Sequence, residues 1–135
     1  PFADLHGWDA AGARASALAT QHGLSRVAVQ NWTLASRLGW YARPLPVFVL
    51  EEGDSQFQLW SGPLPAGEGA LLVDWSHMAY DPPVGAHGFA TCQLVESLPV
   101  QHIGMPLARF RFYDCRGWAG ATPQPRLTLA PISRN

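Results

Sequence analysis

The chain has 135 residues, a length that predicts one domain whose core is large enough to fold without a metal or a dense set of disulfides. Its net charge of −1 excludes the basic footprint of a nucleic-acid-binding protein, and the sequence has no apolar run long enough to cross a membrane. Charged residues make up only 14% of the chain. Two interpretations fit: a surface covered by a partner or a membrane, or loops rich in glycine and proline. Because the first residue is Pro1, we expect a part of a longer polypeptide.

The first third of the chain alternates helical and strand patterns. Residues 8–22 are rich in alanine and predict a helix that ends at Gly23. Residues 26–30 (RVAVQ) predict a short buried strand. Asn31 is a suitable N-cap for a second helix, which we expect to end before Pro44. In that second helix, apolar residues recur at helical spacing: Leu34, Ala35, Leu38 and Tyr41.

Two further short strands are predicted at residues 46–50 and 69–75, both of them continuously apolar. Such strands, separated by helical patterns, are typical of parallel sheets that helices cover on both faces. The segment 54–60 fits either a short helix or an edge strand.

The pattern changes after His77, where residues 77–88 form a loop rich in proline and glycine. Residues 89–98 and 107–113 then predict two antiparallel strands joined through Gly104. The second of these strands alternates two apolar with two charged residues, which predicts one buried and one exposed face: Phe110, Phe112, Arg109 and Arg111.

The sequence therefore predicts an α/β fold, with a small, mostly parallel sheet flanked by helices and extended by a C-terminal antiparallel β-hairpin. We expect residues 1–120 to form a single soluble domain. Residues 121–135 contain three prolines and predict an extended tail.

The register of the hairpin bears on the two cysteines. If Ile103 and Gly104 form a two-residue turn, charged, apolar and cysteine pairs face each other: Glu96 and Arg111, Val95 and Phe112, Cys92 and Cys115. Directly opposed cysteines lie within reach of a disulfide, which an oxidising compartment would permit. Pro99 argues against this register, because a proline can force a bulge that shifts the pairing. A Cys92–Cys115 disulfide and two free thiols therefore both remain open.

Asp74 and His77 lie at the end of a predicted strand, the edge of α/β sheets at which ligands bind. Together they suggest a metal site or an acid–base pair. Two ligands do not make a metal site, and the other histidines have no ligand spacing, so we favour Asp74 as the cap of the following turn. With Ser76 the pair also suggests a hydrolase, but no G-x-S-x-G sequence is present. We predict no catalytic residue, metal or cofactor for this chain alone.

Aromatic side chains cluster near the predicted strand ends and in the second helix, with polar residues beside them. Three roles are open to them: packing in the core, docking on a membrane-embedded partner, or stacking on a sugar or a lipid headgroup. For Arg109 and Arg111 we favour solvated strand positions over contact with a lipid phosphate. The candidate ligand or docking surface consists of Trp32, Arg37, Trp40, Tyr41, Gln56, Trp60, Asp74, Trp75 and His77.

Four segments in this order carry a family resemblance. They are GWDAAGARA at 7–15, QNWTLASRLGWYARPLPV at 30–47, SQFQLWSGPLPAGEGALLVDW at 55–75, and FRFYDCRGWAG at 110–120. Together they resemble the soluble C-terminal region of bacterial family 39 glycosyltransferases, relatives of dolichyl-phosphate-mannose protein mannosyltransferases. The order and spacing of the segments carry the resemblance, which covers most of the chain.

The resemblance implies a multi-spanning membrane enzyme that transfers a sugar from a polyprenyl-phosphate carrier to an acceptor outside the cytoplasm. In that family the catalytic acid lies in the N-terminal membrane part, so no catalytic residue carries over to this chain. We therefore expect an accessory domain on the periplasmic or extracytoplasmic side of a bacterial cell membrane. Its expected partners are the membrane-spanning part of the same polypeptide and a lipid-linked sugar or acceptor. The alternatives are a stand-alone periplasmic domain that binds a carbohydrate or small ligand, and a small hydrolase.

Overall fold

The computed structural model describes residues 2–50, 64–100 and 107–120, with side chains from Gly7 onward except that of Trp32. The segment at 54–60, the Gly104 turn and the tail at 121–135 lie outside these residues. Within the described residues, no helix combines the length and the hydropathy needed to cross a membrane. The elements follow in chain order: α1 (Phe2–Gln21), β1 (Val27–Val29), α2 (Trp32–Tyr41), β2 (Val47–Val49), β3 (Ala70–Trp75), β4 (Phe89–Val100) and β5 (Ala108–Trp118).

Helix α1 begins six residues earlier than the sequence predicts and ends where it predicts. Gly23 adopts a positive φ of 71°, and its N–H donates to the carbonyl of Thr20 while the N–H of Leu24 donates to that of Ala19. This pair of bonds is the Schellman cap that favours glycine. The face toward the sheet is built mostly from small residues, which bring the helix close to the strands: Ala11, Ala15, Leu18 and Ala19.

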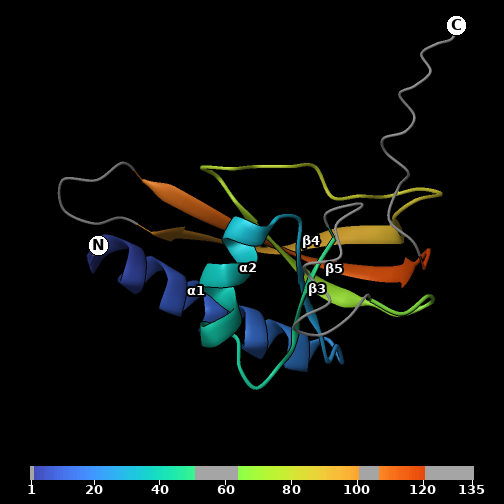
Figure 1. Ribbon diagram of the computed structural model, residues 1–135, viewed down its shortest axis with the longest axis horizontal. Helices are drawn as coiled ribbons and strands as arrows, with labels where there is room; N and C mark the ends of the chain where they lie inside the picture. The colour runs from blue at the N-terminus through green and yellow to red at the C-terminus, as the bar shows by residue number, and fades with distance from the viewer. Residues whose placement is uncertain (1, 51–63, 101–106, 121–135) are drawn as a thin grey trace, which may run out of the picture.

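Helix α2 also follows its sequence signals. Asn31 is the N-cap, and its side chain accepts a hydrogen bond from the N–H of Leu34 at 2.9 Å. Leu34, Ala35 and Leu38 are buried against the sheet, as their helical spacing predicts. The two helices pack against each other in Figure 1, and a side chain at Gly12 of α1 would overlap the backbone of Tyr41 in α2.

One five-stranded sheet, in the order β2-β1-β3-β5-β4, forms the centre of the molecule (Figure 1). The predicted parallel arrangement of β1, β2 and β3 is confirmed. The prediction of a mostly parallel sheet is wrong, because β5 pairs antiparallel with both β3 and β4 over long stretches. The strands of the hairpin are far longer than β1 and β2, so the antiparallel part dominates the sheet.

Both described helices lie on the same face of the sheet; residues 51–63, between β2 and β3, lie outside the described residues, so helices on both faces stay a prediction. The core on that face joins α1 and α2 to Val29, Leu71 and Phe112. The opposite face holds a second cluster without a described helix: Ala28, Phe48, Leu50, Leu64, Ala70, Leu72, Phe89, Cys115 and Trp118.

The hairpin keeps the predicted register over its first half only. Cys92 faces Cys115, and the two are joined by a disulfide. A bulge between Leu94 and Glu96 then shifts the pairing by one residue, so the predicted pairs of Glu96 with Arg111 and of Val95 with Phe112 are wrong. Each charged residue finds another partner: Glu96 bonds Arg14 of α1, and Arg111 bonds Asp74 of β3.

Pro99 does not cause this bulge. It faces Arg109, whose N–H and carbonyl both bond Ser76 beyond the end of β3. In an antiparallel ladder, two opposed residues that do not bond each other direct their N–H and carbonyl groups away from each other. Because the backbone groups of Arg109 point toward Ser76, the backbone nitrogen of Pro99 points away from β5. A proline is tolerated there because the ladder loses no hydrogen bond.

Candidate functional site

The carboxyl ends of the parallel strands β1 and β3 form the edge at which α/β sheets bind ligands. β1 lies between β2 and β3, so the chain leaves it through α2 to one side and returns to the other side with β3. At such a reversal, ligands of α/β sheets bind beyond the carboxyl ends of the strands. Asn31 follows β1 at this edge, and Ser76 and His77 follow β3.

Asp74 is a structural residue of this edge. Its side chain is only 1% exposed, and its two oxygens accept hydrogen bonds from Nη2 of Arg111 at 2.6 Å and from the backbone N–H of Tyr80 at 2.9 Å. The bond to Asp74 raises the pKa of Arg111 above its ordinary value, although burial opposes the shift. Asp74 thus ties β3 to β5 and caps the turn after β3, the role that the sequence favoured. Arg111 is an ion-pair partner rather than a freely solvated residue.

His77 and Trp75 do come together, through their rings. The two ring centroids lie 5.0 Å apart, and Trp75 in turn lies 5.0 Å from Trp8 of α1. The guanidinium of Arg37 in α2 stands 5.8 Å from the Trp8 ring. The result is a row of four side chains, Arg37, Trp8, Trp75 and His77, from α2, α1, β3 and the turn after β3. The row runs from the exposed side of α2 to the exposed His77.

Trp8 is the member of this row that the candidate set missed. It is buried, and its ring also meets that of Phe110 edge-on at 5.0 Å. A signal was present in the sequence, because Trp8 lies three residues before Ala11 and seven before Ala15 on the apolar face of α1. Only the fold brings that face against Trp75.

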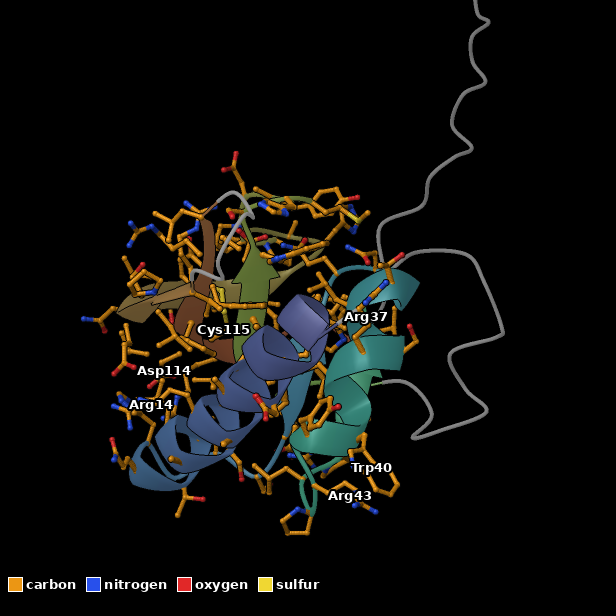
Figure 2. The ribbon with its side chains drawn as sticks, turned by 90° about the vertical axis from the view of Figure 1, so that its left-hand side faces the viewer. Arg14, Arg37, Trp40, Arg43, Asp114 and Cys115 are labelled. Atoms are coloured by element: carbon orange, nitrogen blue, oxygen red, sulfur yellow. A yellow bond between two sulfur atoms is a disulfide. The ribbon has the colours of Figure 1, made fainter. Side chains whose placement is uncertain are left out.

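The other predicted aromatics of α2 lie elsewhere. Trp40 is 63% exposed in the last turn of the helix, and the guanidinium of Arg43 stacks 3.4 Å from the centre of its ring. Figure 2 shows Arg37 and the Trp40–Arg43 pair toward opposite ends of α2. Tyr41 is half-buried against α1. Gln56 and Trp60, like the side chain of Trp32, lie outside the described residues.

A second polar cluster joins the end of α1 to β5. Nδ1 of His22 lies 2.9 Å from Oδ2 of Asp114, and Arg116 donates to Asp114 Oδ1 at 2.7 Å and to the carbonyl of His22 at 2.6 Å. The bonds from Arg116 and then from His22 lower the pKa of Asp114, against the opposing effect of burial. The sequence could not reveal this cluster, because 92 residues separate His22 from Asp114. Arg116 bonds both His22 and Asp114, so the cluster of these three residues connects the end of α1 to the sheet.

These arrangements limit the chemistry of the site. Among the described residues, no three His, Cys, Asp or Glu side chains are grouped closely enough to hold a metal ion. The oxygens of Asp74 are taken by Arg111 and Tyr80, and the hydroxyl of Ser76 accepts the N–H of Arg109. What the edge offers is an aromatic surface beside the N-terminus of a helix.

The fold and this edge define a mixed α/β domain in which the half-buried Trp75 meets the exposed ring of His77 and the exposed Trp40 meets Arg43. Comparison with known proteins found no relative: the chain matches no family model, no curated protein sequence and no solved structure.

Proposed function

We propose that this chain is an extracytoplasmic accessory domain of a membrane glycosyltransferase of the family 39 type, docked on the membrane part through Trp40 and Arg43. The observation that carries the proposal is the position of Trp40. In the helical segment that resembles the family, Ala35 and Leu38 are buried and are explained by packing. Trp40 is 63% exposed, so the domain's own core does not explain it.

A tryptophan with an arginine on its face suits a surface between protein and membrane. Tryptophan and tyrosine concentrate where apolar and aqueous surroundings meet, and arginine keeps its charge in water while its stem packs on an apolar surface. The Arg43 guanidinium already covers the Trp40 ring at 3.4 Å, which fixes both side chains at the end of α2. A fixed pair loses little conformational entropy when a partner covers it.

The Cys92–Cys115 disulfide supports the proposed compartment. Disulfides form and persist in the periplasm and outside cells, and they are rare in the reducing cytosol. The bond joins two adjacent strands of the hairpin, and both cysteines belong to the cluster behind the sheet.

The way the polar groups are used supports accessory rather than catalytic action. A hydrolase built on Asp74 and His77 needs the carboxylate to orient the imidazole. That carboxylate instead accepts hydrogen bonds from Arg111 and Tyr80. The domain would act by position, limiting access of water or orienting the acceptor at the mouth of the membrane part.

A second function has one observation in its favour. The neighbouring rings of Trp75 and His77, tilted at 44° to each other at the carboxyl edge, could hold a sugar ring, as a stand-alone periplasmic binding domain would. The coding sequence upstream of Pro1 separates the two functions. About ten apolar segments of about 20 residues each would support the accessory domain, and their absence would contradict it.

The biochemical test compares the isolated chain with the full-length polypeptide, using polyprenyl-phosphate sugars and candidate acceptors. The isolated chain should transfer no sugar, and deletion of the domain should lower transfer by the full-length protein. Transfer or carrier hydrolysis by the isolated chain that disappears in Asp74→Ala or His77→Ala would contradict the proposal.

A further inference from the structure

The N-terminus of α2 contains a polar atom that the fold leaves without a partner. Asn31 is 8% exposed, and its Oδ1 is occupied by the N–H of Leu34 at 2.9 Å. Its Nδ2 is buried and has no hydrogen-bond partner, the one such side-chain atom among the described residues. A buried amide donor without an acceptor is costly, so native proteins rarely leave one unpaired.

The cap fixes the direction of this donor. Because Oδ1 is held by the first turn of α2, the Nδ2 of the same planar amide is held at that turn as well. A flip of the amide would satisfy neither group, since it would turn an N–H toward the N–H of Leu34. Nδ2 therefore remains an unpaired donor beside the first turn of α2.

Two further properties of this terminus favour a negatively charged acceptor. α2 has ten residues, enough for its peptide dipoles to add up at the N-terminus, and its first turn contains no acidic residue that would offset them. The first N–H groups of a helix have no acceptor within the helix, which leaves those of Trp32 and Thr33 beside Asn31. The terminus also lies at the reversal of strand order beyond β1, where ligands of α/β sheets bind.

We propose that the N-terminus of α2 binds a small oxyanion group, a phosphate or a carboxylate, which accepts hydrogen bonds from Asn31 Nδ2 and from the N–H groups of the first turn. The bound group supplies the acceptor that Nδ2 lacks, and it lies at the positive end of the helix dipole. This site is independent of docking through Trp40, which lies in the last turn of the same helix.

The test uses the 15N-labelled chain, titrated with sodium phosphate and with sodium acetate at constant ionic strength. Saturable shifts should appear in the Asn31 side-chain amide and in the backbone amides of Trp32 and Thr33, with a dissociation constant of about 1 mM or tighter for at least one of the two anions. Sodium chloride is the control for ionic strength and should not shift these signals in a saturable way.

Two variants isolate the donor, because serine and aspartate both cap helices as well as asparagine does. Asn31→Ser keeps an acceptor for Leu34 and removes Nδ2, and it should weaken binding at least about tenfold. Asn31→Asp also keeps the acceptor and places a negative charge in the site, so saturable binding should disappear. Arg26→Gln, before the start of β1 and at the opposite end of that strand from Asn31, should bind like the unaltered chain. Thermal unfolding should show that all three variants remain folded.

Vesicles identify the source of the group. Binding to phosphatidylglycerol vesicles that is lost in Asn31→Ser indicates a lipid headgroup, whereas binding of inorganic phosphate or acetate alone indicates a small dissolved ligand. Either result supports the site. The proposal is overturned if no probe shifts the Asn31 amide saturably, or if Asn31→Ser binds as tightly as the unaltered chain. If both Asn31 variants unfold, the proposal is judged by which signals of the unaltered chain shift. Saturable shifts that lie away from the first turn of α2 overturn the proposal.

Discussion

The two halves of the sheet are built by different means. β1 and β2 contribute three residues each, all of them buried, and their side chains alternate between the core under the helices and the second cluster. β4 and β5 are 12 and 11 residues long, and much of β4 is exposed. The hairpin is instead held by its long ladder, a disulfide and ion pairs to α1 and β3.

The parallel half therefore depends on burial, whereas the hairpin depends on specific bonds. Short parallel strands have few ladder bonds of their own and stay in place because they lie under other elements. In Figure 1 the hairpin and the N-terminal part of α1 extend beyond the rest of the sheet, so fewer elements cover the hairpin there. Its free edge is interrupted by a bulge and by Pro99, devices that discourage pairing with another chain.

The largest effect is expected where the two halves meet. Phe112 of β5 is fully buried in the core that also contains residues of α1, α2 and β3. Phe112→Ala should lower the free energy of unfolding by about 3–5 kcal/mol, because it removes a large side chain and leaves a cavity. Chemical denaturation monitored by tryptophan fluorescence measures the loss. A loss below about 1 kcal/mol would show that the halves are not joined through one core.

Removal of the disulfide should affect the hairpin more than the parallel half. The double variant Cys92→Ala with Cys115→Ala should lose about 3 kcal/mol, as expected for a crosslink that closes a loop of about 24 residues. Hydrogen exchange should quicken in β4 and β5 before it quickens in β1 and β2. The reduced chain is the matched control and should behave like the double variant; equal acceleration in all strands would contradict the division into halves.

A smaller effect is expected where the two helices touch. A methyl group at Gly12 would lie 2.6 Å from the carbonyl carbon of Tyr41, so Gly12→Ala should destabilise the chain by about 1–2 kcal/mol although alanine favours helices. Thr20→Ala, on the exposed side of α1, measures the helix preference alone and should be neutral or slightly stabilising. If Gly12→Ala stabilises as much as the control does, the close approach of the helices is wrong.

The smallest effect is expected for the cluster of His22, Asp114 and Arg116, which connects the end of α1 to β5. The pKa of Asp114 lies below its ordinary value of 3.8, so its carboxylate stabilises the fold at neutral pH and loses this effect as the pH falls through the lowered pKa. Asp114→Asn should cost about 1 kcal/mol at pH 7, and the difference from the unaltered chain should vanish between about pH 5 and pH 2. Asp9→Asn, an exposed residue of α1, is the control. A difference that persists at pH 2 would mean that the charge of Asp114 does not matter.

The parallel half was predictable because its signals are local. The apolar runs, the Asn31 cap and the Gly23 stop each act within a few residues, and β1, α2 and β2 follow them. The hairpin was predictable only up to the bulge, since the partners of Glu96 and Arg111 come from α1 and β3. The candidate site shows the same limit: sequence reasoning found Trp75 and His77, but it could not pair them with Trp8 before the fold placed α1 against β3.

The most direct test of the proposed function is sugar transfer by the full-length polypeptide with Trp40→Ser. The domain should remain as stable as before, because Trp40 is exposed and packs outside both cores. Transfer should fall at least about tenfold, the loss expected when a central aromatic anchor leaves an interface. Leu94→Ser, at an apolar side chain of β4 that is 52% exposed, is the matched control and should leave transfer unchanged. Full transfer by the Trp40→Ser polypeptide would contradict docking through the end of α2.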